Sequence, residues 1–257
     1  MTTQPPRIVV VTAGGLNPQV MINALVAHFG SVTVLREQPE SKATFLRRRA
    51  RMLGMATACG QLATMVVSRF GKRLMQRRTR EILDQYGASA AENTAATVIP
   101  IGSINGDDGH RALRSLAPEV VFLISCRMLS RRTLAHIPCP VINFHAGINP
   151  AYRGLMGGYW ARVNGDEENF GATVHLVDEG VDTGGILYQA RMTPSASDTL
   201  HTYPLLQTAA ATGIAIRAIE DALAGRLRTL PAEGPSRQWY HPPVWTWLYH
   251  GLARGIW

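Results

Sequence analysis

The chain has 257 residues, of which 46% are hydrophobic, so it can bury the core of one large domain or of a domain with an appendage. Its three cysteines are widely spaced and its eight histidines lack metal-ligand spacing, which argues against a disulfide framework and against a metal site. The net charge of +8 belongs to one segment. Residues 41–80 hold 11 basic residues and no acidic one, whereas the rest of the chain has 15 basic and 18 acidic residues.

The N-terminal sequence shows no signal-peptide pattern and leads directly into an apolar strand, so we expect a cytoplasmic protein. Short apolar strands then alternate with helical stretches, which predicts an α/β fold with a mostly parallel sheet. Residues 231–257 are rich in Pro and Trp, and we expect them to be irregular. Strands are expected at residues 7–12, 32–35, 97–101, 120–125, 141–145, 171–177 and 185–190, and helices at residues 17–28, 107–117 and 200–227.

Two polar side chains stand at the end of the apolar strand VINFH, residues 141–145. Because side chains alternate along a strand, Asn143 and His145 share one face and Phe144 points to the other. Turn-forming residues follow at once in AGINPAYRG. Ligand sites of open α/β sheets lie at such carboxyl ends, although a polar strand end capped by its own loop gives the same pattern.

An acidic loop, DEGVDTG, joins the strands expected at 171–177 and 185–190 and contains Asp178, Glu179 and Asp182. In the simplest interpretation it is a solvated turn in which Asp182 caps its own backbone. Together with the strand end, it also supplies a third polar group. Asn143, His145 and Asp182 are a hydrogen-bond donor, a protonatable donor and a proton acceptor, and these groups suit acyl transfer without a metal or a covalent nucleophile.

The pair of segments VINFHAGINPAYRG and GATVHLVDEGVDTGGILYQ resembles the folate-dependent formyltransferases. This resemblance implies a Rossmann-like fold with helices on both faces of the sheet, and it makes Asn143, His145 and Asp182 the catalytic residues. It also implies N10-formyltetrahydrofolate as co-substrate and no metal. The pterin pocket would then be lined by Arg127, Met128 and Leu129 on one side and by Val177, Asp178, Glu179, Gly180 and Val181 on the other.

The amine acceptor is less closely defined by the same resemblance. In the purine-pathway branch of the family, the loop after the first strand binds the acceptor's phosphate, and Gly15 and Asn17 match that loop. Leu16 stands where a hydroxyl would help to bind the phosphate. We therefore favour an amino sugar on a nucleotide or lipid carrier. Glycinamide ribonucleotide is the alternative acceptor, and hydrolysis of the donor by water or a non-catalytic folate-binding role are alternative functions.

The resemblance assigns residues 1–230 to a formyltransferase catalytic domain with a basic helical insertion at about 40–90, followed by the 231–257 tail. Within the insertion, residues 52–68 carry no charge and are flanked by RRRAR and RFGKR. Three interpretations are open: a helical hairpin packed on the sheet, a peripheral membrane contact through 42–80, or an arm around an anionic acceptor. Nucleic acid is not expected as a partner, because only Phe45 and Phe70 lie among the arginines.

Overall fold

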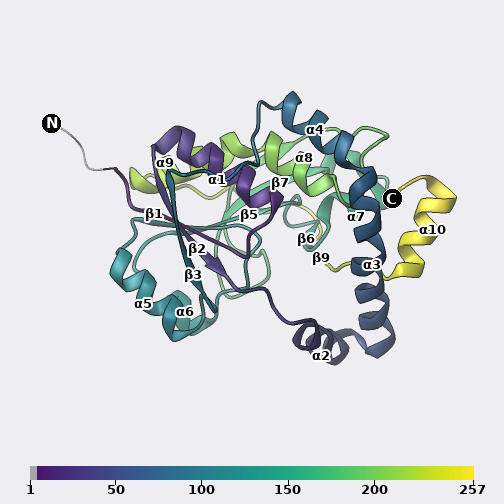
Figure 1. The fold of residues 1–257 in the computed structure, drawn as a ribbon, viewed down its shortest axis with the longest axis horizontal. Helices are drawn as coiled ribbons and strands as arrows, with labels where there is room; N and C mark the ends of the chain where they lie inside the picture. Colours follow the sequence, from purple (N-terminus) through teal and green to yellow (C-terminus); the bar gives the residue numbers. More distant parts are fainter. Residues whose placement is uncertain (1–4) are drawn as a thin grey trace.

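The computed structural model describes residues 5–257, apart from the side chains of residues 69, 70, 72 and 73. The basic residues Arg69, Lys72 and Arg73 counted above therefore have side chains outside the described set. A seven-stranded sheet in the order β3-β2-β1-β4-β5-β7-β8 forms the centre of the fold (Figure 1). Its strands are β1 (Ile8–Thr12), β2 (Val32–Glu37), β3 (Ala96–Ile101), β4 (Val120–Leu123), β5 (Val141–His145), β7 (Gly171–Leu176) and β8 (Ile186–Arg191).

The predicted, mostly parallel sheet is confirmed. The strands β1 to β5 pair in parallel, whereas β7 runs antiparallel to both β5 and β8. Helices cover both faces, so the buried strands have a core on each side. One face is covered by α1 (Leu16–Phe29) and α9 (Thr212–Leu223), and the other by α5 (Asp107–Leu116) and α6 (Arg131–Ala135).

The long helix expected over residues 200–227 is two helices, α8 (Tyr203–Ala210) and α9, so that expectation is wrong at its centre. The break falls at Ala211, whose N–H bonds to the Thr208 carbonyl in a tighter turn. The change of direction allows α8 to pack on α4 (Gln76–Gln85) and α7 (Gly157–Val163) while α9 packs on the sheet. An alanine-rich junction gave no sequence signal of this bend.

The basic segment forms α2 (Lys42–Leu53), α3 (Met55–Leu74) and α4, so it is helical. The hairpin interpretation is wrong about its partner, because α3 packs on α2, α4 and α10 (Val244–Arg254) instead of on the sheet. The tail is also more ordered than expected, since it forms β9 (Gln238–Trp239), which pairs with β6 (Arg153–Gly154), and then α10. A one-turn 3-10 helix, Glu167–Asn169, precedes β7.

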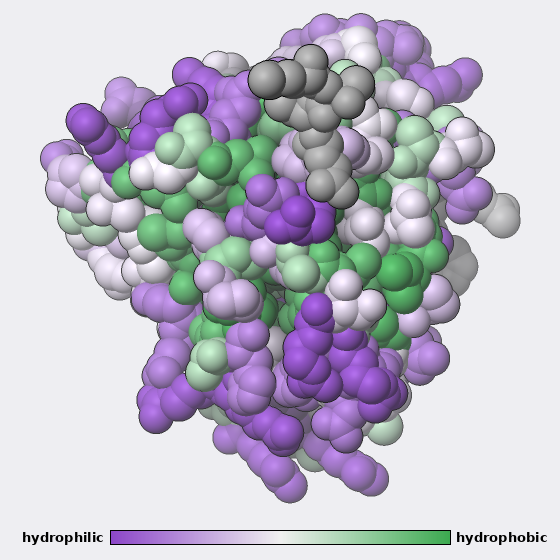
Figure 2. Space-filling model, turned by 90° about the vertical axis from the view of Figure 1, so that its left-hand side faces the viewer, coloured by the Kyte–Doolittle hydropathy of each residue, from purple (hydrophilic) through white to green (hydrophobic). Residues whose placement is uncertain are grey.

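In Figure 1, α2, α3 and α10 lie together at one side of the molecule, beyond β6 and β9. We call these three helices the arm. Figure 2 shows the opposite side, where hydrophilic residues gather along the lower edge and hydrophobic ones lie in smaller areas above them. No helix among the described residues combines the length and apolar character needed to cross a bilayer.

Candidate active site

The carboxyl end of β5 and the neighbouring strand β7 hold three polar side chains on one face. The strand register places Asn143 opposite His175 and His145 opposite Thr173. Phe144 points the other way and is buried in the core, as the alternation predicts. Asn143 Nδ2 lies 3.0 Å from His175 Nε2. Two adjacent strands thus bring an amide and two imidazoles to one point.

Asp182 reaches this cluster from the loop between β7 and β8. Its Oδ1 accepts from Asn143 Nδ2 at 3.2 Å, and its Oδ2 accepts from the Gly154 N–H at 2.8 Å and lies 3.5 Å from His145 Nδ1. Its φ of 51° turns it inward, a conformation that Asp tolerates better than most residues. The structure therefore brings Asn143, His145 and Asp182 together.

The alternative in which Asp182 caps its own loop is wrong. That role belongs to Asp178, whose Oδ1 accepts from the Gly180 N–H at 2.9 Å and from the Thr183 hydroxyl at 2.7 Å. The loop is held from outside as well, because Arg153 donates to the Val181 carbonyl at 2.7 Å. With these bonds made elsewhere, the Asp182 carboxylate is left to face the strands.

Burial by itself would raise the pKa of the Asp182 carboxyl. The charge of His145, the hydrogen bond and charge of His175, and the Gly154 N–H together outweigh it and hold that pKa well below its ordinary value. Asp182 is consequently an ionised carboxylate at neutral pH, although only 14% of its side chain is exposed. A buried negative charge of this kind attracts protons and cations that enter the site.

Both ring nitrogens of His145 face protein groups. Nε2 lies 2.7 Å from the Tyr152 carbonyl, which only accepts, so this nitrogen carries a proton. Nδ1 faces Asp182, and a second proton there makes the ring a cation paired with the carboxylate. Direct donation from Nε2 to a ligand requires the ring to turn from Tyr152.

His175 is a member of the cluster that the sequence interpretation missed. Its Nδ1 donates to the Leu176 carbonyl at 2.7 Å, which leaves Nε2 facing Asn143 and, at 3.3 Å, Asp182 Oδ1. A neutral ring accepts from the Asn143 amide, and a protonated ring donates to Asp182. The sequence shows one imidazole in the expected strand GATVHLV, but only the pairing of β7 with β5 places it beside Asn143.

The two loops expected to hold the pterin lie next to each other. Arg131 at the start of α6 pairs with Glu179, and this ion pair bridges the 125–130 loop to the 177–181 loop. Leu129 is buried in the same core cluster that Val177 packs against, whereas Met128 is 53% exposed.

Some polar groups of the 125–130 loop already have partners. The Arg127 N–H donates to Glu37 at 3.0 Å, and the Met128 carbonyl accepts from Asn105 at 2.9 Å. Glu37 is 2% exposed and also accepts from the Ile104 N–H at 2.8 Å, so it fixes two loops at once. Burial raises the pKa of the neighbouring Cys126 thiol, which keeps this cysteine protonated.

The loop after β1 opens onto a hollow of about 480 Å³. Gly15 lines it, but Asn17 does not, so only one of the two expected acceptor residues faces this space. Arg36, near the end of β2, also lines the hollow. Its side chain lies 4.0 Å from the Cβ position of Gly14, and its buried Nε has no partner among the described residues. The sequence interpretation missed Arg36, because only the parallel pairing of β1 with β2 brings it to the loop.

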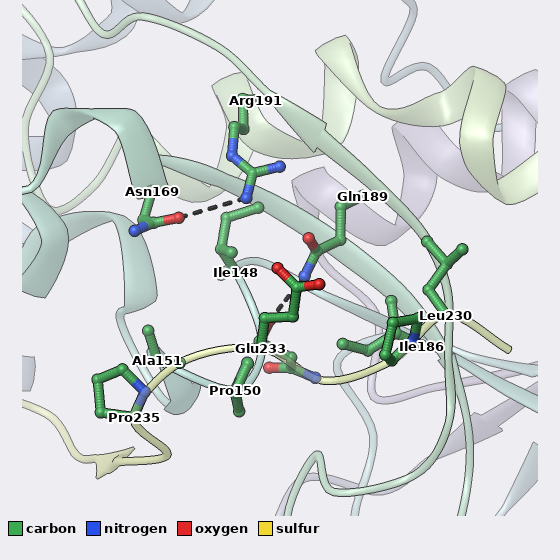
Figure 3. A pocket seen from close by; sticks show the side chains of 13 residues that line it. Ile148, Pro150, Ala151, Asn169, Ile186, Gln189, Arg191, Leu230, Glu233 and Pro235 are labelled. Atoms are coloured by element: carbon green, nitrogen blue, oxygen red, sulfur yellow. Dashed lines mark hydrogen bonds between the residues drawn. The ribbon is translucent and has the colours of Figure 1, made fainter.

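A second, smaller hollow of about 190 Å³ lies behind the 146–154 loop (Figure 3). Asn149 connects this loop to two neighbouring segments. Its side-chain amide donates to the Asp182 carbonyl at 3.0 Å, while its own carbonyl accepts from Gln189 at 2.7 Å. Figure 3 shows Gln189 and Arg191, which come from β8, and Glu233, which comes from the tail, among the side chains that line it. This hollow backs the Asp182 loop and contains none of the three catalytic candidates.

Fold and site define the class: a mostly parallel α/β domain with a buried Asn–His–Asp cluster at the carboxyl edge of its sheet. The sequence model of formyl transferase matches residues 7–218, which is most of the chain. The protein belongs to the formyl transferase family.

Curated relatives are methionyl-tRNA formyltransferases. The chain is 26% identical over 175 residues to that of Kosmotoga olearia, covering 68% of this chain and 53% of the relative. It is 37% identical over 122 residues to that of Anaeromyxobacter dehalogenans, covering 47% and 36%. The chain therefore spans about half the length, or less, of these relatives.

Solved structures share the fold at low identity. The phosphoribosylglycinamide formyltransferase of Anaplasma phagocytophilum is 17% identical with a TM-score of 0.57, covering 92% of this chain and 100% of that one. The N-formyltransferase of Helicobacter canadensis, in complex with folinic acid and dTDP-3-aminofucose, is 12% identical with a TM-score of 0.55, covering 91% and 70%.

Proposed function

We propose that the protein transfers the formyl group of N10-formyltetrahydrofolate to the primary amine of a small anionic acceptor. The observation that carries this proposal is the contact of one buried carboxylate, Asp182, with both Asn143 and His145 at the carboxyl edge of the sheet. Family membership supports the same reaction. None of the three groups has to form a covalent bond with the substrate.

In this reaction the amine nitrogen attacks the formyl carbon, and the carbonyl oxygen takes up the negative charge of a tetrahedral intermediate. The Asn143 amide is the donor for that oxygen, and it turns to it from the long contact with Asp182. The positive charge of His145 stabilises the same oxygen. A donor aimed at such an oxyanion is worth about 3 kcal/mol of the activation free energy.

Asp182 accepts the proton that the attacking amine must lose, directly or through a water molecule. The bond between the formyl carbon and N10 then breaks, and N10 regains a proton. Because the pKa of Asp182 is low, the carboxyl is a weak base that passes the proton on instead of retaining it. The products are a formamide and tetrahydrofolate, so protons and electrons balance without a metal.

We assign the donor to the two bridged loops, with Arg127, Met128 and Leu129 on one side and the 177–181 loop on the other. Arg36, whose Nε has no partner among the described residues, lines the same hollow as Gly15 and supports an anionic acceptor, because a guanidinium binds phosphate. An amino sugar on a nucleotide or lipid phosphate has this charge and a primary amine. We favour it over glycinamide ribonucleotide because Leu16 offers no hydroxyl to a phosphate.

The test supplies N10-formyltetrahydrofolate with and without a panel of nucleotide-linked amino sugars and glycinamide ribonucleotide, and measures tetrahydrofolate and N-formyl product by mass spectrometry. We expect product only with an amino sugar. Formate released without any acceptor would assign a hydrolase instead. Failure of the protein to bind a folate analogue by calorimetry would remove the proposal altogether.

A further inference from the structure

Helix α3 buries several polar residues and exposes several apolar ones. Gln61, Thr64 and Ser68 are at most 5% exposed, whereas Met55 is 61% and Val66 is 41% exposed. The helix of a soluble domain normally does the opposite, because burial of apolar surface is what stabilises it. One of the buried polar residues links two elements: the Thr64 hydroxyl donates to the Pro242 carbonyl at 2.8 Å, just before the start of α10.

Helix α10 continues the same apolar surface. Its exposed residues Trp245, Leu248, Tyr249 and Leu252 recur at the spacing of one helix face, and Leu252 is 78% exposed. The Trp245 ring lies over Gly60 of α3, where a Cβ would come within 2.4 Å of it. Helix α10 therefore packs directly on α3.

We call this surface the α3–α10 face; it comprises Met55, Val66, Val67 and Leu74 of α3, Trp245, Leu248, Tyr249 and Leu252 of α10, and Met52 at the end of α2. Among the side chains that the structure describes, these are nine of the 14 large hydrophobic residues that are exposed. A concentration of this kind on one side of a molecule marks an interaction surface. The remaining five are scattered over other parts of the fold.

Basic residues border this face at both ends. Lys42, Arg47 and Arg51 on α2, and Arg80 on α4, are exposed and have no ion-pair partner among the described residues. Residues 41–80 contain no acidic residue to neutralise them. The occupant of the face must therefore combine an apolar interior with negative charges at its boundary.

We propose that the α3–α10 face docks on the surface of an anionic lipid bilayer. A helix of 20 residues is about 30 Å long and, lying in the plane of the bilayer, can bury its apolar side among the acyl chains while arginines contact lipid phosphates. A second copy of the chain is the poorer occupant, because it would bring the same basic border against itself. The bilayer supplies the missing anions.

A short connection leads from this face to the candidate active site. Gly154, which donates to Asp182, pairs with Trp239 of β9, and α10 begins five residues later. Tyr240, which directly follows Trp239, has its ring centroid 4.8 Å from the guanidinium carbon of Arg49 in α2. If the proposed function holds, an acceptor amine carried on a lipid reaches the site from the docked side.

The test is co-sedimentation with vesicles of phosphatidylcholine alone and of phosphatidylcholine with phosphatidylglycerol. We expect binding to the anionic vesicles only, and weaker binding as salt rises. The variant Lys42→Gln, Arg47→Gln and Arg51→Gln alters exposed side chains alone and should lower the partition coefficient about 100-fold, at about tenfold or less for each charge. The variant Val66→Gln, Leu248→Gln and Leu252→Gln should lower it at least as much.

The matched control is Val98→Gln with Leu230→Gln, which changes exposed apolar residues outside the face and should bind like the wild type. Equal binding of all variants, or none by the wild type, would overturn the proposal. A dimer in sedimentation velocity that the apolar variant abolishes would instead assign the face to a second copy. These measurements need neither donor nor acceptor, so their outcome is independent of formyl transfer.

Discussion

Helix α1 buries Met21 and Leu25 completely, whereas α3 buries Gln61 and Thr64 and leaves Met55 and Val66 in solvent. Helix α1 follows strand β1, and helix α3 follows helix α2. The difference lies in what each helix packs on. Helix α1 lies on the sheet and gains from apolar burial, while α3 packs mainly on the helices α2, α4 and α10. The body of the protein is thus stabilised by apolar burial, whereas the arm leaves large apolar side chains exposed.

The largest effect on stability should come from the ion pair that ties α4 to the body. Arg78 makes two bonds of 2.8 Å to Asp198, whose side chain is fully buried. Replacing Asp198 by Ala leaves the largely buried arginine with only a 3.6 Å contact to the partly exposed Glu81, and should cost about 3–5 kcal/mol of the free energy of unfolding in urea. The control is Arg77→Ala, which breaks an exposed pair and should change stability by less than about 1 kcal/mol. Equal losses of stability in the two variants would contradict the distinction between the buried and the exposed ion pair.

Two leucines compare body and arm directly. Leu25 in α1 is fully buried and Leu252 in α10 is 78% exposed. The change Leu25→Ala leaves a cavity and should cost about 2–5 kcal/mol, whereas Leu252→Ala should stay within about 0.5 kcal/mol. Chemical denaturation measures both. A large loss for Leu252→Ala would mean that the arm is stabilised internally after all.

Acid should loosen the arm before the body. His241 lies three residues before α10. Desolvation, aided by the charge of Arg49, lowers the pKa of His241 to about 4. In the unfolded chain the pKa of this histidine is near 6.5. As pH falls from about 6.5 to 4, the unfolded state binds a proton that the folded state does not, and the free energy of unfolding therefore decreases.

The body should respond at lower pH. Burial would raise the pKa of Asp198, but bonds from Arg78, Ser195 and Thr202 lower it instead. Its contribution is complete above the unfolded pKa near 4 and is lost as pH falls below that value. Hydrogen exchange should therefore show α10 opening at a higher pH than the sheet, and His241→Gln should remove this early phase. Simultaneous opening would contradict the two windows.

The strands and the Asn143–His145–Asp182 cluster were predictable because each depends on local pattern: an apolar run, an alternation of two, and turn formers after the strand. Family resemblance then joined the two segments. Arg36 and His175 were missed because their roles arise from pairing between strands, which alternation alone does not locate. The packing of α3 on α10 joins residues about 180 positions apart, at Thr64 and Pro242, and no local signal encodes it.

The most direct test of the account is the turnover of Asp182→Asn. Asparagine matches aspartate in shape and tolerates the φ of 51°, so the fold and folate affinity should persist. Loss of the proton acceptor should lower formyl transfer by roughly two to four orders of magnitude. Turnover is measured with N10-formyltetrahydrofolate and the acceptor that the panel of amines identifies, and folate affinity by calorimetry. A variant that binds folate normally and keeps near-normal turnover would contradict the role of this carboxylate.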